Sequence, residues 1–502
     1  MRSNSIVSLA ILAALPCVNA ITLHKRDDPA VFGLPITRQR SQALQKRSSS
    51  VASTSLYNVN NLYYMVNITL GTPAQNLSLS LDIGSSDIWV NVPNSTYCAA
   101  DNDPCSSTGL FNLKDSSTFK MLDYEMNATY AAGNLAVGPY ATDTLTIGDA
   151  TVKNMEFSLA EESANPHGIL GIGYAISTYA AANLDKEYAN LPEALVNSGA
   201  IKSAAYSLWL NKFDETGNIL FGGVNKARYQ GELQTVPVLP LYGRYYSLAI
   251  ALTDISIKST KGTKSYATGL PLSVSLDNGS SFIVLPKELV DPIYKDVGAG
   301  YSSTAGAAYI PCDMSTADYN VTFSFSGATI TIPISELVFD HYTEPGFPEG
   351  DCIFGLSYSE PGVNLMGDAF LRGAYVVYDL ANNEISLANT NYDGGDDEIL
   401  EIGTGTAAVP GATLMPSAVT SATGNGAEAT AAALGSLGSE SGGTTVYITG
   451  TGTGTGTAST ATGTANSGGA SSTSSKGLAA LPTSNPNHLL PGLLGAGLLL
   501  AL

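Results

Sequence analysis

Between about residue 56 and residue 390, apolar and polar residues alternate in short runs that are separated by Gly, Asn, Asp and Pro. Alternation with a period of two is typical of strands that bury one face. We therefore expect strands at YYMVNITLG (63–71), DTLTIGD (143–149), VTFSFSGATITIPI (321–334) and AYVVYDL (374–380). The best helix candidates are short, LPEALVNSG (191–199) and PKELVDPIYKDV (286–297). The pattern predicts a mainly β protein that is too large for a single sandwich.

An internal repeat is the strongest pattern in the chain. The stretch LSLSLDIGSSDIWVNVP (77–93) recurs 195 residues later as LSVSLDNGSSFIVLPKE (272–288). Each copy runs from an alternating strand into an aspartate, Asp82 or Asp277, and each is followed further on by two apolar residues and a glycine (169–171 and 365–367). A single aspartate at the end of a strand is often a turn residue. Two in duplicated frames indicate two β-rich lobes that face each other across a cleft.

Two carboxylates held together cannot both ionise easily, so their pKa values separate and one group keeps a proton. The ionised group can then take a proton from a bound water molecule that attacks an amide carbonyl, while the protonated group donates to the carbonyl oxygen. This chemistry needs no cofactor, no metal ion and no covalent acyl-enzyme. The pair therefore predicts hydrolysis of peptide bonds.

These residues resemble the pepsin-like aspartic proteases, in particular the fungal cell-surface yapsin type, over about residues 56–389. The resemblance makes Asp82 and Asp277 the catalytic aspartates. It implies a bilobal pepsin-like fold with a central cleft that binds extended peptides. It places a flap tyrosine at Tyr130 within ATYAAGNLAVGPYATDTLTIG (128–148). The other supporting residues that it implies are Trp89, which steadies the tyrosine, Gly84 and Gly279 of the turns, and Ser85 and Ser280, whose hydroxyls bond the carboxylates.

The chain departs from the family in the residue after each aspartate. The family has Thr or Ser there, and these hydroxyls join the two loops, whereas this chain has Ile83 and Asn278. Ile83 has no polar atom, while the amide of Asn278 offers both a donor and an acceptor. We expect part of the contact to survive. The alternatives are an inactive homologue that displays the cleft as a peptide-binding surface and a structural wall glycoprotein.

The ends of the chain predict a secreted precursor. Residues 1–20 read as a signal peptide, because Arg2 precedes an apolar run that ends in small residues. Residues 21–47 read as a basic pro-segment that ends at the dibasic Lys46-Arg47, with a flexible leader as the alternative. We expect the lobes at 56–238 and 239–390. A disordered stalk rich in Gly, Ser, Thr and Ala is expected at 400–485, and a hydrophobic tail at 486–502.

That tail, which ends in GLLGAGLLLAL, follows small residues and a polar spacer, a pattern typical of a GPI-attachment signal. A short hydrophobic terminus without an anchor is the alternative. A GPI-anchored protein at the plasma membrane or cell wall is the expected location. Secretion also predicts disulfides, and proximity in sequence favours Cys98–Cys105 and Cys312–Cys352. Glycosylation sequons begin at Asn67, Asn76, Asn94, Asn127 and Asn320, and also at Asn278, which we expect to be too buried for modification.

Composition narrows the remaining choices. The 502 residues carry a formal charge of −20 at pH 7, which argues against nucleic acid as a partner and suits an acidic medium. Four histidines without a His-Glu-x-x-His motif leave a zinc protease without ligands, and His167 is expected to be a packing residue. A glycosidase also uses two carboxylates, but that reading explains neither the repeat nor Tyr130. We expect a monomer.

Overall fold

The computed structural model describes most of the chain up to Gly424. Its described residues are 31–39, 63–100, 103–130, 135–212, 215, 217–241, 243–339, 346–359 and 363–424. The predicted signal peptide, the predicted hydrophobic tail and the dibasic site lie outside these residues. Within them, no helix combines the length and the apolar composition needed to cross a membrane.

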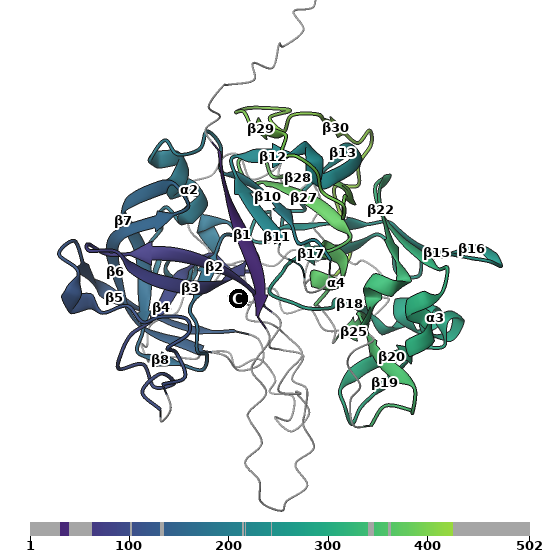
Figure 1. Ribbon diagram of the computed structural model, residues 1–502. Helices are drawn as coiled ribbons and strands as arrows, with labels where there is room; N and C mark the ends of the chain where they lie inside the picture. Colours follow the sequence, from purple (N-terminus) through teal and green to yellow (C-terminus); the bar gives the residue numbers. More distant parts are fainter. Residues whose placement is uncertain are drawn as a thin grey trace, which may run out of the picture.

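One large sheet forms the first lobe and continues through the middle of the molecule (Figure 1). Its strands follow the order β30 (Ala412–Leu414), β13 (Tyr229–Pro237), β28 (Glu384–Thr390), β27 (Ala374–Asp379), β10 (Ala205–Trp209), β11 (Gly217–Phe221), β1 (Phe32–Gln39), β2 (Tyr63–Leu70), β3 (Gln75–Asp82), β9 (Ile169–Gly171), β4 (Ile88–Asn91), β7 (Ala150–Ala160), β6 (Leu135–Ile147) and β5 (Lys120–Thr129). The short β8 (Glu162–Ser163) pairs with β6. The fold is therefore mainly β, as predicted.

Three smaller sheets build the second lobe, on the right of Figure 1. The first contains β14 (Ala249–Leu252), β17 (Leu272–Leu276), β26 (Leu365–Met366), β18 (Ile283–Pro286) and β25 (Leu356–Ser359). The second contains β16 (Gly262–Tyr266), β15 (Asp254–Ser259), β21 (Asn320–Phe325) and β22 (Ala328–Pro333). The third contains β19 (Gly300–Ser302), β20 (Ala307–Pro311), β24 (Asp351–Phe354) and β23 (Val338–Phe339).

The helices of the described residues are short. They are α1 (Tyr179–Leu184), α2 (Leu191–Asn197), α3 (Lys287–Val297) and α4 (Asp368–Leu371). Helix α3 buries Leu289, Ile293 and Val297, which recur every fourth residue on one face, and it ends at Gly298 in the left-handed conformation. Both helices expected from the sequence, α2 and α3, are confirmed, as are the four expected strand regions.

The predicted pro-segment contributes a strand to the central sheet. The sequence pattern does not predict this strand. Strand β1 pairs with β11 on one side and with β2 on the other. Its alternate residues Phe32, Leu34 and Ile36 are buried, and Ile36 is completely so. Release of residues 21–47 would therefore remove a strand from the middle of the sheet.

The predicted stalk begins later than expected. Residues 399–424 pack against the body instead of extending from it, through β29 (Ile399–Glu401) against β12 (Gly223–Asn225) and β30 against β13. Further along, Ser273 donates to the carbonyl of Thr423 over 2.7 Å. Ile402, Ala408 and Val409 are buried against the central sheet. The predicted boundary at residue 400 is therefore wrong, because apolar residues in this low-charge segment find a surface to cover.

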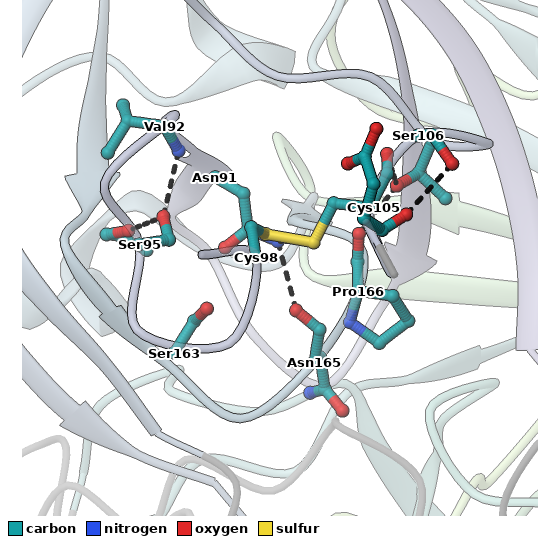
Figure 2. The surroundings of a disulfide bond; sticks show 12 residues. Asn91, Val92, Ser95, Cys98, Cys105, Ser106, Ser163, Asn165 and Pro166 are labelled. Atoms are coloured by element: carbon teal, nitrogen blue, oxygen red, sulfur yellow. Dashed lines mark hydrogen bonds between the residues drawn. A yellow bond between two sulfur atoms is a disulfide. The ribbon is translucent and has the colours of Figure 1, made fainter. Parts of the chain in front are cut away.

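Both predicted disulfides are confirmed, Cys98–Cys105 and Cys312–Cys352. Figure 2 shows the first of them beside residues of the 163–166 segment. The side chain of Asn91, at the end of β4, donates to the carbonyl of Asn165 over 3.0 Å. This bond ties β4, the strand that follows the Asp82 loop, to the 163–166 segment beside the disulfide.

Candidate active site

The two repeated segments occupy equivalent places in the two lobes. Asp82 is the last residue of β3, which pairs in parallel with β9, so that Asp82 lies opposite Gly171. Asp277 directly follows β17, which pairs in parallel with β26, and its N–H donates to the carbonyl of Met366 over 3.3 Å. The two apolar-apolar-glycine elements found in the sequence are therefore the strands beside the two aspartates.

The glycines of these elements allow close approach of the aspartate loops, which we define as residues 82–87 and 277–282. A Cβ atom on Gly171 would lie 2.6 Å from the carbonyl oxygen of Asp87. A Cβ atom on Gly367 would lie 2.3 Å from the carbonyl oxygen of Ser280. Any other residue would push the loop away, so the repeated glycines fix the position of both carboxylates.

Both carboxylates are buried and hydrogen-bonded by the turn that follows them. Asp82 is 1% exposed and Asp277 is 2% exposed. The N–H of Gly84 donates to Oδ1 of Asp82 over 3.0 Å, and the N–H of Gly279 donates to Oδ1 of Asp277 over 2.8 Å. The N–H groups of the two predicted turn glycines thus each donate a hydrogen bond to the aspartate two residues earlier.

The electrostatics couple the two acids. Burial raises the pKa of Asp82 and of Asp277, and the nearby charge of Asp277 raises the pKa of Asp82 further. The N–H of Gly84 interacts with Asp277 as well, so one amide of the first loop serves both carboxylates. Residues 195 positions apart thus form one acidic pair, which favours a state with a single shared proton.

The two serines of the repeat behave differently. Ser85 donates to Oδ2 of Asp82 over 2.5 Å, and this bond lowers the pKa of Asp82 against the effect of burial. The hydroxyl of Ser280 donates instead to the carbonyl of Phe282 over 3.4 Å. The expected bond from Ser280 to Asp277 is therefore not made, because this hydroxyl turns toward its own backbone.

Asn278 joins the two loops. Its side-chain oxygen accepts from the N–H of Ile83 over 3.0 Å, and its side-chain nitrogen donates to the carbonyl of Leu81 over 2.9 Å. Both bonds are buried. The side chain of Ile83 is 3% exposed, packs into the main apolar core and has no polar atom, so only the backbone N–H of Ile83 takes part. The side-chain amide of Asn278 therefore makes two hydrogen bonds to the backbone around Asp82.

A small cavity of about 30 Å³ adjoins Asp277. Gly84 and Ser275 line it, together with Tyr174 and Tyr246. A cavity of this size is large enough for one water molecule. The cavity therefore leaves room for a water molecule beside Asp277, one member of the pair.

The predicted flap tyrosine lies beside the predicted tryptophan. Tyr130 follows β5, and its ring centroid is 6.3 Å from that of Trp89. Burial raises the pKa of Tyr130 well above its usual value, and the indole N–H of Trp89 lowers it only in part. No hydrogen bond of ordinary geometry joins the two side chains. The tip of the flap, residues 131–134, lies outside the described residues.

Sequence reasoning missed a third buried carboxylate close to the pair. Asp87 is completely buried, and its partners are the hydroxyls of Tyr140 and Tyr188 and the N–H of Tyr179. A charged residue directly before the buried strand Ile88–Asn91 was the available signal. The position of its three partners could not be read from the sequence.

The sequon residues separate by exposure. Asn67, Asn76, Asn94 and Asn127 are exposed and Asn320 is partly exposed, whereas Asn278 is 2% exposed. The expectation that Asn278 is buried is therefore confirmed. His167 is also buried, and burial lowers its pKa to about 4.

Two β-rich lobes, each with an Asp-x-Gly-Ser turn at the end of a central strand, define a bilobal pepsin-like aspartic protease. Comparison with known sequences agrees. The family described as "Eukaryotic aspartyl protease" matches residues 63–390. The chain belongs to this family and is an aspartic-type endopeptidase.

Individual relatives cover most or all of the chain. It is 42% identical over its whole length, and over the whole of the relative, to "Probable aspartic-type endopeptidase opsB" of Aspergillus oryzae. It is 44% identical to the Aspergillus fumigatus protein of the same description, over 82% of this chain and 86% of that one. It is 34% identical to "Aspartic proteinase yapsin-3" of Saccharomyces cerevisiae, over 76% of this chain and 77% of that one.

Proposed function

We propose that this protein is a secreted, GPI-anchored endopeptidase that hydrolyses peptide bonds at acidic pH, with Asp82 and Asp277 as its catalytic residues. The observation that carries the proposal is the contact between the loops. Asn278 and Gly84 bring two buried carboxylates from separate lobes into one electrostatic pair.

The proposed reaction uses the raised pKa values of the pair. At acidic pH one carboxyl group is protonated and the other is ionised. The ionised group takes a proton from water, whose oxygen forms a bond to the carbonyl carbon, while the protonated group donates to the carbonyl oxygen. Collapse of the tetrahedral intermediate breaks the carbon–nitrogen bond, and a proton passes to the leaving nitrogen. One product leaves with a new carboxyl group and the other with a new amino group. A hydroxyl of the intermediate returns its proton to the pair, which again holds a single proton.

An extended peptide suits the cleft between the lobes, under the hairpin formed by β5 and β6. Tyr130 would cover the reacting bond and limit the access of water. Its raised pKa keeps the hydroxyl neutral across the working range. Substrates would therefore be protein segments that are already unfolded or exposed.

The proposed location rests on the chain ends. The signal-like start, the sequons on exposed asparagines and the two disulfides all suit the secretory pathway. The C-terminal tail supplies the proposed lipid anchor. Treatment of cells with a phosphatidylinositol-specific phospholipase should release the protein, and a protein found solely in the medium would contradict the anchor.

Cleavage of denatured haemoglobin tests the activity. Protein freed of its pro-segment should cleave it near pH 4, and pepstatin should block the cleavage. The Asp82→Asn and Asp277→Asn variants should both be inactive. No cleavage by the unaltered protein between pH 2.5 and 6 would leave the fold without the proposed reaction and would favour a peptide-binding role.

A further inference from the structure

Asp87 is a completely buried carboxylate that takes no part in the proposed reaction. It lies five residues beyond Asp82 in the same loop. Burial of an ionised acid is unfavourable unless hydrogen bonds replace its solvation. Burial accordingly raises the pKa of Asp87, against the effect of its hydrogen bonds. A carboxylate buried in this way is expected to have a structural or functional role.

The partners of Asp87 come from three separate parts of the first lobe. The hydroxyl of Tyr140, on β6, donates to Oδ1 over 2.7 Å. The hydroxyl of Tyr188, beyond α1, donates to the same oxygen, also over 2.7 Å. The N–H of Tyr179, the first residue of α1, donates to Oδ2 over 2.6 Å. One carboxylate therefore ties β6 and the α1 region to the loop that carries Asp82.

Strand β6 is the return strand of the flap hairpin. It pairs with β5, and Thr129 at the end of β5 lies opposite Leu135 at the start of β6. Tyr130 follows directly and packs in one cluster with Trp89, Tyr140 and Ala180. The link from Asp87 to Tyr140 thus reaches the base of the flap.

The loop is equally well fixed on its other side. The carbonyl of Asp87 accepts from the N–H of Gly171 over 2.9 Å, and the carbonyl of Asp82 accepts from Ile172 over 3.0 Å. The backbone between Asp82 and Asp87 therefore cannot shift independently of β9. The loop from Asp82 to Asp87, held against β9, and the bond from Tyr140 to Asp87 therefore connect the proposed catalytic carboxylate to β6.

We propose that Asp87 is a positioning residue, which acts through Tyr140 to set the place of the flap and Tyr130 above Asp82. The proposal rests on the proposed proteolytic function, because the flap matters only when a peptide lies beneath it. Loss of the link leaves both catalytic carboxylates in place and loosens the cover over the substrate. The expected loss is smaller than the roughly 100-fold that a misplacement of reacting groups by about 1 Å can cause, because both catalytic carboxylates keep their places.

The Tyr140→Phe variant is the sharpest test, because it removes a single hydroxyl from the link and keeps the ring. We expect kcat/KM for a peptide that spans the cleft to fall about tenfold, mainly through a rise in KM. Tyr375→Phe is the matched control. Tyr375, on β27, is also buried; its hydroxyl donates to Ser207 and accepts from the N–H of Asn225, in a side-chain cluster separate from that of Tyr140.

The two variants separate positioning from stability. Both should lower Tm, and Tyr375→Phe should leave KM and kcat unchanged. If both lower Tm and neither alters KM or kcat, Asp87 is a purely structural residue and the proposal is overturned. Inactive unaltered protein would instead reject the proposed function, so the two failures are distinguishable.

Substitution of Asp87 itself gives a rescue test. Asp87→Asn keeps an oxygen that can accept from both tyrosine hydroxyls and loses the acceptor for Tyr179. It should retain kcat/KM within about threefold. Asp87→Ala removes every acceptor and should show at least the loss of Tyr140→Phe. Equal losses for Asn and Ala, in variants that stay folded, would contradict a role through Tyr140.

Discussion

The loop at Asp82 and the loop at Asp277 share a sequence pattern and a place in their lobes, yet they differ in every side-chain contact that could have been shared. The first holds its carboxylate with Ser85, whereas Ser280 in the second bonds the carbonyl of Phe282. The second reaches across with Asn278, whereas Ile83 in the first faces the apolar core. The two repeated segments therefore share their backbone positions, while their side chains make different contacts.

The division follows from what each side chain can do. Asn278 supplies a donor and an acceptor at once, so one residue replaces two reciprocal hydroxyls. The side chain at position 83 then needs no hydrogen bond, and Ile83 contributes buried apolar surface instead. The carboxylates themselves are the one feature that neither loop can give up.

The largest expected effect is loss of either acid. Asp82→Asn and Asp277→Asn should each lower kcat by more than about 1000-fold, because one carboxyl group cannot serve as base and acid at once. Initial rates on haemoglobin at pH 4 measure this loss. Activity within tenfold of the unaltered protein in either variant would show that the two loops are not both catalytic.

The next effect concerns the contact between the loops. Asn278→Ala leaves the N–H of Ile83 and the carbonyl of Leu81 unpaired and should lower the free energy of unfolding by about 2–5 kcal/mol. Activity should fall as well, because the carboxylates lose their common support. Urea unfolding with parallel rate measurements tests both.

Ile83→Thr is the counterpart, since it returns a hydroxyl to the first loop. Stability should change by less than about 1.5 kcal/mol, because a new hydrogen bond offsets the lost apolar burial. A destabilisation as large as that of Asn278→Ala would mean that the two positions are not specialised as described.

The serines should show a smaller contrast. Ser85→Ala removes a bond to the ionised form of Asp82 and therefore raises the pKa of Asp82 further. The charge of Asp277 makes Asp82 the member of the pair that keeps the proton, so the alkaline limb of the kcat/KM profile should shift toward higher pH. Ser280→Ala should change the rate less than about threefold, and a shift as large as that of Ser85→Ala would refute the asymmetry.

The smallest effect is on the pH dependence of stability. The pKa values of Asp82 and Asp277 are raised in the folded protein. Their contribution to stability is therefore complete below the ordinary value of 3.8 and is lost as the pH rises through the raised values. Asp277→Asn should be more stable than the unaltered protein at pH 7 and nearly equal to it at pH 3. Thermal unfolding across this range measures the difference, and parallel curves would contradict it.

The sequence alone determined whatever depends on local pattern or on exact repetition. Alternation set the strands around Leu79 and Val376, helical spacing set α3, and the duplicated Asp-x-Gly-Ser frames identified the acid pair. Proximity identified the two disulfides. Each of these signals lies within a few residues or recurs in recognisable form.

Tertiary structure alone decided which distant groups meet. The strand at Phe32–Gln39 joins the central sheet between β11 and β2, and Ile402 packs against that sheet beyond the expected end of the lobe. The hydrogen-bond partners of the Ser280 hydroxyl and the Asp87 carboxylate could not be predicted from the spacing of residues in the sequence. A hydrogen bond is satisfied by any donor or acceptor of suitable geometry, and only the folded backbone determines which one is within reach.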